Sequence, residues 1–237
     1  MLEALRAEVP VSGLYVAEGT QRDGRLRELF KLAAHRGIAL LEVPRPELDA
    51  LTASSTHQGV AARIPEYEYA HPDDLLKRAS GRGEDALVVA LDSVTDPHNL
   101  GAVIRSAAGF GAHGVVVPAR RSAGMTAAAW KASAGAAARL PVARATNLTR
   151  ALESYQSSGA MVLGLAADGE VPLPELDPGL APGPLVLVVG SEGSGLSRLV
   201  AQTCDVLVSI PMAGPLESFN ASVAASLALY EVVCRRG

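Results

Sequence analysis

Short, uninterrupted apolar runs separated by helical patterns constrain the fold of this chain more than any other feature. Residues 86–91, 115–117 and 185–189 are apolar at every position and rich in Val and Leu. A strand without polar alternation is typical of a parallel sheet that is covered on both faces. Since helical periodicity lies between the runs, we predict an α/β fold, a mostly parallel sheet with helices on both faces. Ligands of such sheets bind beyond the carboxyl ends of the strands.

The same reading places the other elements of this region. Further strands are expected at 141–145, 161–165 and 206–210. Helices are expected at 98–110, 124–138, 147–157, 195–203 and 219–235. Strands and helices therefore alternate along most of the region, which is the order that a parallel sheet requires.

The 237 residues are expected to form two domains joined by a linker. Residues 1–65 are predicted to be a small α/β domain, with strands at 11–17, 38–43 and 59–64 and helices at 22–36 and 46–53. Residues 66–85 combine proline, glycine and charged residues, so we interpret them as a linker that carries one short helix near 73–79. Residues 86–237 form the second, larger domain.

Charge and cysteine content narrow the possible functions. The formal net charge of −4 argues mildly against a nucleic-acid binder, so any RNA contact must come from local basic clusters. The candidate clusters are Arg22, Arg25, Arg27 and Lys31; Arg120 and Arg121; and Arg144 and Arg150. For any single cluster, a solvated face is the commoner explanation.

A metal site, a disulfide and a membrane segment are not expected. The two cysteines, Cys204 and Cys234, lack metal-type spacing, and the five histidines are scattered. The N-terminus does not resemble a signal peptide, and the apolar runs are far shorter than a bilayer span. With 49% hydrophobic residues, the chain has enough apolar material for a large core, so we expect a folded, cytoplasmic protein.

Near the C-terminus, a stiff loop leads into an apolar helix. The loop follows a strand that ends at Ile210 and is stiffened by Pro211, Gly214 and Pro215. Three short polar residues at alternate positions come next: Ser218, Asn220 and Ser222. The following helix is almost wholly apolar, so we expect it to be buried. One helix needs only one N-cap residue. Three polar residues at alternate positions therefore favour a ligand-binding site in addition to capping.

A second polar segment follows the strand at 86–91. Asn99 lies in the first turn of a helix, and Gly101 allows a neighbour to approach the backbone closely. Arg105 comes six residues after Asn99, within about 120° of it around the helix axis. The surrounding helix is small and apolar, so a buried Arg105 would need an anionic partner. An arginine that reaches the surface is the commoner case.

The third segment is a Gly-rich turn, Gly190-Ser191-Glu192-Gly193-Ser194-Gly195, between a strand and a helix. Such a turn can cradle a phosphate, but Glu192 would repel one. The acidic residue that a dinucleotide fold places about twenty positions later is missing, and P-loop and G-x-S-x-G motifs are absent. A carboxylate here suits a hydroxyl, an amine or an arginine. We therefore predict an ion pair between Glu192 and Arg105, with a simple surface loop as the alternative.

In order and spacing, these segments resemble the three motifs of the SpoU (TrmH/RlmB) family, RNA 2′-O-ribose methyltransferases of the SPOUT class. The matching residues are Asp96-Pro97-His98-Asn99-Leu100-Gly101 with Arg105; Gly190-Ser191-Glu192-Gly193; and Ile210-Pro211-Met212 with Ser218-Phe219-Asn220-Ala221-Ser222. Residues 1–65, including His57-Gln58-Gly59-Val60, are similar to the family's small substrate-binding domain. The resemblance implies a C-terminal trefoil knot that binds S-adenosylmethionine, although protein connections are otherwise nearly always unknotted.

The resemblance also implies the functional residues. Those implied for cofactor binding are Gly190, Ile210, Met212, Ser218, Phe219, Asn220 and Ser222, and those implied for catalysis are Asn99, Arg105, Glu192 and Asn220. Arg105 is the implied group for removal of the 2′-hydroxyl proton. Because guanidinium groups stay protonated in proteins, binding an RNA phosphate or stabilising the developing alkoxide are alternatives. A homodimer is implied, in which the partner chain completes each site.

A guanosine of 23S rRNA is the favoured target, and methylation of tRNA or of a resistance-type rRNA nucleotide remains open. An NAD-type oxidoreductase and an RNA-binding module without catalysis are the remoter alternatives. Phe219 departs from the family pattern because leucine is common there, and its bulk is expected to narrow the pocket. The chain begins inside what resembles the family's first helix, so we expect a basic N-terminal extension to be missing.

Overall fold

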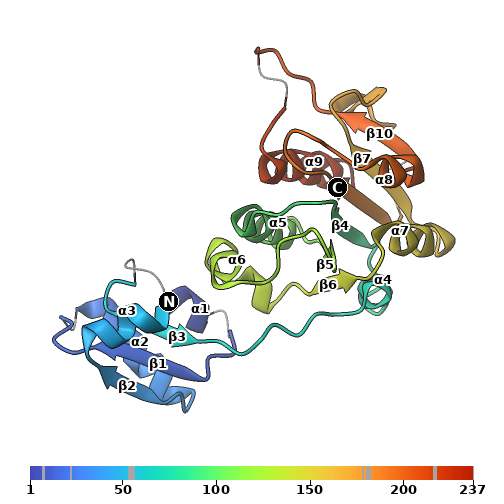
Figure 1. Cartoon of the computed structure of the whole chain (residues 1–237). Helices are drawn as coiled ribbons and strands as arrows, with labels where there is room; N and C mark the ends of the chain where they lie inside the picture. Colours follow the sequence, from blue (N-terminus) through green and yellow to red (C-terminus); the bar gives the residue numbers. More distant parts are fainter. Residues whose placement is uncertain are drawn as a thin grey trace. The chain divides into compact units, whose positions relative to one another are not determined.

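The computed structural model describes residues 1–6, 9–21, 23–52, 57–177, 179, 183–215 and 218–236. Within these, the chain divides into two compact units, residues 1–68 and 69–237, which Figure 1 colours from blue to red. Some positions in the predicted segments lie outside the described residues: Arg22, Ala53 and residues 216–217.

Among its described residues, the first unit contains a three-stranded sheet and three helices. The strand order is β2 (Leu40–Val43), β1 (Gly13–Ala17) and β3 (Val60–Arg63), with β1 parallel to β2 and antiparallel to β3. The helices are α1 (Leu2–Arg6), α2 (Gly24–His35) and α3 (Arg45–Thr52). Asp23 caps α2 by accepting a hydrogen bond of 2.7 Å from the backbone N–H of Leu26. Buried side chains of β1, α2 and α3 form its core, including Leu14, Leu29 and Leu48.

The second unit contains a seven-stranded sheet in the order β6-β5-β4-β9-β7-β10-β8. The strands are β4 (Leu87–Leu91), β5 (Gly114–Pro118), β6 (Val142–Ala145), β7 (Met161–Leu165), β8 (Val171–Pro172), β9 (Leu185–Val189) and β10 (Val206–Ser209). Each pairing between these strands is parallel. Every residue of β4 and β9 is buried. The predicted α/β fold with a mostly parallel sheet is confirmed.

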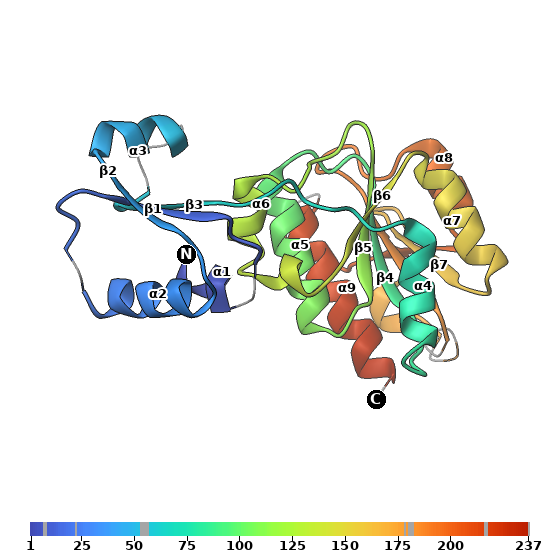
Figure 2. The ribbon, with the colours of Figure 1, turned by 90° about the horizontal axis from the view of Figure 1, so that it is seen from below.

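Helices cover both faces of this sheet (Figure 2). On one face, α5 (Pro97–Gly109) packs against both α6 (Ala127–Ala132) and α9 (Ala221–Arg236). On the other face, α7 (Leu148–Ser157) packs against both α4 (Pro72–Ser80) and α8 (Arg198–Thr203). The carboxyl edge of the sheet is thus left for loops, as in other α/β proteins.

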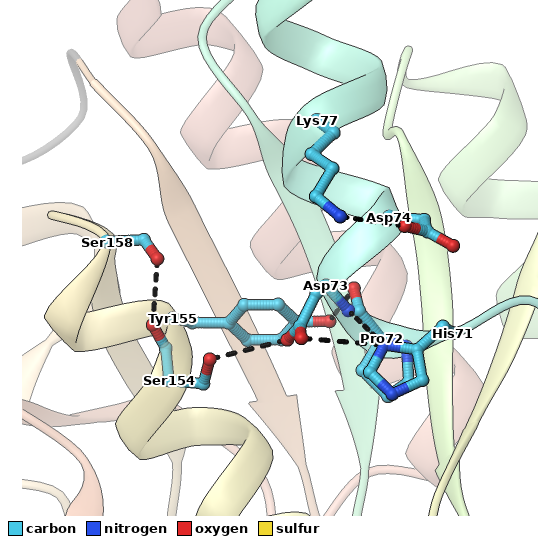
Figure 3. Close-up of polar contacts among 8 residues, drawn as sticks. All are labelled: His71, Pro72, Asp73, Asp74, Lys77, Ser154, Tyr155 and Ser158. Atoms are coloured by element: carbon cyan, nitrogen blue, oxygen red, sulfur yellow. Dashed lines mark hydrogen bonds and ion pairs between the residues drawn. The ribbon is translucent and has the colours of Figure 1, made fainter.

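Residues 69–85, which we predicted to be part of a linker, lie in the second unit. There α4 is held to α7 by side chains that Figure 3 draws. The hydroxyl of buried Tyr155 donates a hydrogen bond of 2.7 Å to the carbonyl of Pro72, and Ser154 donates one of 3.3 Å to Asp73. Burial raises the pKa of Tyr155, and the charge of Asp73 raises it further. The phenol therefore stays neutral and can serve as a donor at any physiological pH.

The predicted helix at 124–138 is wrong as one continuous element. The helix α6 ends at Ala132, and a separate 3₁₀ turn covers Ala136–Ala138. Between them, Ala134 and Gly135 have φ values of 49° and 87°. Gly101 of α5 lies against this break, since a Cβ there would come within 2.5 Å of the Ala132 side chain. The alanine-rich sequence favours helix, so the close crossing of α5 and α6 overrides local propensity.

The strand β10 lies between β7 and β8, which are consecutive in the chain. The connection from β7 to β8, residues 166–170, must therefore cross the end of β10. Gly169 of this connection lies so close that a Cβ would come within 2.5 Å of the Val208 backbone. The sequence does not predict β8, because a two-residue strand carries no periodicity.

The C-terminal helix α9, which we predicted to be buried, is buried on one side only within the single chain. Ala225 and Leu229 are inaccessible, but Val223, Leu227 and Tyr230 are 44%, 39% and 57% exposed. These three residues are spaced by four and three positions, so they share one face of the helix. Among the described residues, no helix is long and apolar enough to cross a bilayer.

Candidate functional site

Three loops at the carboxyl edge of the sheet line a cavity of about 710 Å³. They follow β7, β9 and β10, and contribute residues 166–168, residues 190–196, and residues 210–212 with Ser218 and Phe219, respectively. These strands are neighbours in the parallel sheet, so their carboxyl ends meet at one place. Ala221 and Ala224 of α9 also line the cavity. The volume lies within the range of sites for small molecules and cofactors.

Beside the cavity, Asn99, Glu192 and Asn220 form a hydrogen-bonded network. The amide of Asn99 donates to the carboxylate of Glu192 at 2.9 Å, and the amide of Asn220 donates to the side-chain oxygen of Asn99 at 3.0 Å. The same amide of Asn220 also donates to Glu192, and the backbone N–H of Ala221 lies 3.4 Å from that carboxylate. The network therefore brings together one residue from each of the three polar segments.

Asn220 has two roles, and the oxygen and the nitrogen of its side-chain amide each carry one of them. Its oxygen accepts from the backbone N–H groups of Ser222 at 2.9 Å and Val223 at 3.3 Å, which is N-capping of α9. Its nitrogen donates to Asn99 and Glu192 instead. The hydroxyl of Ser222 donates to the same Asn220 oxygen at 2.6 Å. Capping and site formation are thus carried by one side chain.

The predicted ion pair between Glu192 and Arg105 is wrong. The Glu192 carboxylate is engaged by the two asparagines, and no ion pair or hydrogen bond of the Arg105 side chain occurs among the described residues. Arg105 is exposed on α5, about 9 Å along the helix from Asn99. It is therefore available to a ligand that approaches from solvent.

The residues predicted to bind the cofactor fall into two groups. Those that line the cavity are Gly190, Ile210, Met212, Ser218 and Phe219. Asn220 and Ser222 lie next to it, at the N-terminus of α9. The cavity is also lined by Leu165 and Asp168, which we did not identify from the sequence. Asp168 comes three residues after β7, so the carboxyl-edge rule that selected the other loops would also have selected it.

Asp92 anchors the Gly-rich turn to the end of β4. Its side chain is only 5% exposed, and it accepts hydrogen bonds from the Ser197 backbone N–H at 2.6 Å and the Ser93 hydroxyl at 3.1 Å. Within the turn, the backbones of Ser191 and Gly195 exchange hydrogen bonds of 3.1 and 2.9 Å. The turn that forms one wall of the cavity is therefore fixed at both ends.

The thiol of Cys204 is not poised for chemistry. Burial raises the pKa of Cys204 to about 12, and the charges of Asp205 and Asp92 raise it in the same direction. Cys204 and Cys234 are both free thiols. In the part of the chain that the structure describes, no group of three or more His, Cys, Asp or Glu residues could hold a metal ion.

Two family models match the chain. Residues 86–230 match the SpoU rRNA methylase family, and residues 1–70 match the family described as RNA 2′-O ribose methyltransferase substrate binding. A relative in Mycobacterium sp. (strain KMS), described as an uncharacterized tRNA/rRNA methyltransferase, is 58% identical over 236 residues. That alignment covers 100% of this chain and 74% of the relative.

Solved structures show the same likeness. The SpoU methyltransferase AviRb from Streptomyces viridochromogenes, in complex with AdoMet, has a TM-score of 0.77 and 29% identity, covering 99% of this chain and 86% of that chain. An AdoMet-bound rRNA methyltransferase from Sinorhizobium meliloti has a TM-score of 0.75 and 26% identity, covering 98% and 82% respectively. Both similarities extend over both units.

Proposed function

This chain belongs to the SpoU rRNA methylase family, and from that premise we propose that it transfers a methyl group from S-adenosylmethionine to a ribose 2′-hydroxyl of RNA. The observation that carries the proposal is the network of Asn99, Glu192 and Asn220 beside a cofactor-sized cavity. This network joins the three motifs that the resemblance identified in the sequence. The matched substrate-binding region at residues 1–70 supports RNA as the acceptor.

The lining of the cavity suits S-adenosylmethionine. Leu165, Ile210 and Phe219 offer apolar contacts for an adenine ring, and Asp168 and Ser218 offer groups that bind hydroxyl and amino donors. The missing side chain of Gly190 lets the backbone of Gly195 and Leu196 pack closely against it, which shapes the turn that forms one wall of the cavity. Phe219 lines the cavity, which still measures about 710 Å³, so its bulk does not close the site. Bound there, S-adenosylmethionine supplies a methyl group that its sulfonium already activates.

The protein's own side chains align and stabilise the acceptor. Glu192 fixes the amides of Asn99 and Asn220, and so holds the N-terminal ends of α5 and α9 together at the cavity. Such preorganisation lowers the entropic cost of bringing two reactants together. Arg105 is exposed on α5, where its guanidinium can bind an RNA phosphate, stabilise a developing alkoxide or assist departure of the hydroxyl proton.

A guanosine of 23S rRNA is the target we favour. Both solved structures described above cover nearly the whole chain, and one of them is named an rRNA methyltransferase. The mycobacterial relative is named for tRNA and rRNA together, so methylation of tRNA is the second candidate. The match of residues 1–70 to the substrate-binding family is our reason for favouring rRNA over tRNA.

We also infer that the C-terminal segment is knotted. The support is the position of β10 between the consecutive strands β7 and β8, under the close crossing at Gly169. A chain that leaves β10 beneath the connection 166–170 would be threaded through it. A crystal structure in which residues 210–215 pass outside that connection would contradict the knot.

The test of function is methyl transfer to defined RNA. Purified protein is incubated with tritiated S-adenosylmethionine and with ribosomal RNA or tRNA from a strain that lacks this gene. We expect label in 23S rRNA, at one position that then resists alkaline hydrolysis, since a 2′-O-methyl group removes the hydroxyl nucleophile. Label confined to tRNA would favour the second candidate. If calorimetry showed that the protein binds NAD and does not bind S-adenosylmethionine, the proposal would be rejected.

We also propose that two copies of the chain form a homodimer through α9. Val223, Leu227 and Tyr230 form an exposed apolar face, and Phe110 of α5 holds the Tyr230 ring in an edge-on contact with centroids 6.2 Å apart. A rigid aromatic residue within an apolar patch is typical of an interface. A second copy of the chain could pair the same face across a two-fold axis.

The dimer predicts a specific effect of charge on this face. We expect the wild-type chain to sediment at twice its 24.4 kDa mass and the Leu227→Asp variant to sediment as a monomer with reduced methyl transfer. Leu199→Asp is the matched control, because Leu199 of α8 is 58% exposed outside this face. A wild-type chain that stays monomeric at micromolar concentration would contradict the dimer.

A further inference from the structure

At the β6 end of the carboxyl edge, an arginine is stacked on a tyrosine. The guanidinium carbon of Arg144 lies 3.7 Å from the centroid of the Tyr69 ring. Backbone hydrogen bonds fix this pair, because Ala70 donates to Val142 at 3.0 Å and accepts from Arg144 at 3.3 Å. The Tyr69 hydroxyl also accepts a hydrogen bond of 2.8 Å from the backbone N–H of Met125. The pair is therefore a rigid platform rather than a chance surface contact.

Two further arginines lie on the loop beside this pair. Arg120 and Arg121 follow β5, the neighbour of β6. The loop is tied to both sides, since the Ala119 N–H donates to Ala145 at 2.8 Å and the Ala123 N–H donates to Val94 at 2.8 Å. Arg121 has a φ of 56°, a left-handed conformation that costs free energy in a residue other than glycine. Such strain is often found at functional sites.

The three arginines concentrate positive charge without neutralising partners. All three are exposed, and no carboxylate pairs with any of them among the described residues. The chain as a whole carries a net charge of −4, so this corner differs in sign from the average surface. One face of the Arg144 guanidinium is covered by Tyr69, and its exposure leaves the other face accessible.

The position of these residues relates them to the proposed reaction. The cofactor cavity lies at β9, β7 and β10, and β6 is three strands away from β9 in the same parallel sheet. Three strand spacings amount to roughly 14 Å. The platform is thus too far away to hold the reacting ribose, but it lies on the same edge, where a flanking nucleotide would pass. The bond from Ala123 to Val94 ties its loop to the segment that leads into Asn99.

We propose that Tyr69, Arg120, Arg121 and Arg144 bind a single-stranded stretch of the substrate RNA that flanks the methylated nucleotide. A base stacks on the accessible face of Arg144, and Arg120 and Arg121 bind phosphates. Proteins recognise unpaired RNA by stacking bases on aromatic rings and on guanidinium planes. A nucleobase has a flat face that can stack on the Arg144 guanidinium, whereas the carboxylate of an acidic protein side chain has no flat face of comparable size. The stacked geometry therefore favours RNA over an acidic protein. The inference rests on the proposed function for its choice of RNA.

Affinity for RNA tests this inference without any methyl transfer. A fluorescein-labelled single-stranded RNA of about 16 nucleotides serves as the probe, and its anisotropy is followed over a range of salt concentrations. We expect Arg120→Ala/Arg121→Ala to weaken binding at least about tenfold and to reduce the salt slope by about 0.7 per lost phosphate contact. The matched control is Arg82→Ala/Arg139→Ala, two exposed arginines that precede β4 and β6 and so lie at the opposite edge of the sheet.

The stacking role of Arg144 is tested separately. Arg144→Ala and Arg144→Lys should weaken binding to similar extents, because lysine keeps the charge but has no planar face. Affinity for S-adenosylmethionine, measured by calorimetry, should be unchanged in all these variants. Binding equal to that of the control double variant would overturn the inference, as would full rescue by lysine. Displacement of RNA by polyglutamate of equal charge would indicate an acidic-protein surface and would also overturn it.

This outcome is independent of the proposed catalytic function. Wild-type protein that binds RNA through these arginines but transfers no methyl group would contradict the proposed function and leave the platform standing. Conversely, normal methyl transfer by the triple variant Arg120→Ala/Arg121→Ala/Arg144→Ala would contradict only the platform.

Discussion

Replacing Arg105 with alanine is expected to reduce methyl transfer by about 10²–10³-fold, the effect of removing one group that stabilises a transition-state charge. Affinity for S-adenosylmethionine should remain within about twofold, because Arg105 does not line the cavity. The fold should be unaffected, since the side chain is exposed and its neighbours Ile104 and Ala107 carry the packing of α5. Single-turnover transfer to the RNA substrate and calorimetry with the cofactor measure the two effects separately.

A lysine at this position distinguishes the possible roles of Arg105. If the positive charge binds a phosphate or stabilises an alkoxide, Arg105→Lys should recover part of the lost rate. If the Arg105 side chain instead accepts the 2′-hydroxyl proton, Arg105→Ala and Arg105→Lys should differ in how their rates depend on pH, as well as in the magnitude of the rate. Arg82→Ala is the control for loss of one exposed arginine. Turnover of Arg105→Ala close to that of wild type would exclude Arg105 from the reaction.

Replacing Gly190 with alanine is expected to have an equally large effect, on cofactor binding rather than on the chemical step. A Cβ at this position would press on the Gly195 carbonyl and would lie 2.5 Å from the Leu196 backbone nitrogen. Because backbone atoms cannot rotate away, the turn at 191–195 would have to move. Forced overpacking costs about 1–3 kcal/mol, and the cofactor affinity falls by roughly 10- to 100-fold if binding has to restore the displaced turn.

Calorimetry and thermal unfolding check the Gly190→Ala prediction. We expect a loss of S-adenosylmethionine affinity of roughly 10- to 100-fold, together with a lower Tm. Gly214→Ala is the matched control, because a Cβ on Gly214 meets no atom within 4 Å although the residue lies in the segment after β10. Equal cofactor affinity in the Gly190 and Gly214 variants would show that the turn tolerates a side chain and does not shape the cavity.

The elements that the sequence predicted well are those whose signal is local. The strands 161–165 and 185–189 agree with β7 and β9 residue for residue, because each is a continuous apolar run between polar turns. The three motif segments could also be selected from the sequence, since each follows a buried strand and is rich in Gly, Pro, Ser or Asn. Asp168 was missed because its loop lacks such residues in a recognisable motif.

The errors share a different origin. The break after Ala132 depends on how closely α5 crosses α6, and the exposed face of α9 depends on which neighbours cover it. Neither is encoded in the composition of the segment itself. An alanine-rich stretch favours helix, and an apolar helix favours burial, until tertiary packing decides otherwise.

The sequence by itself determined the parallel α/β fold, the carboxyl-edge location of the polar loops and the motifs of the family. It did so because apolar periodicity and turn chemistry act over a few neighbouring residues. Only the tertiary structure decided the partners of Glu192, which are Asn99 and Asn220 and not Arg105. Asn99 is 93 residues from Glu192 and 121 residues from Asn220 in the chain. Contacts over such separations follow from the order and register of the strands, so Arg105 was left exposed to solvent while an amide network formed at the cavity.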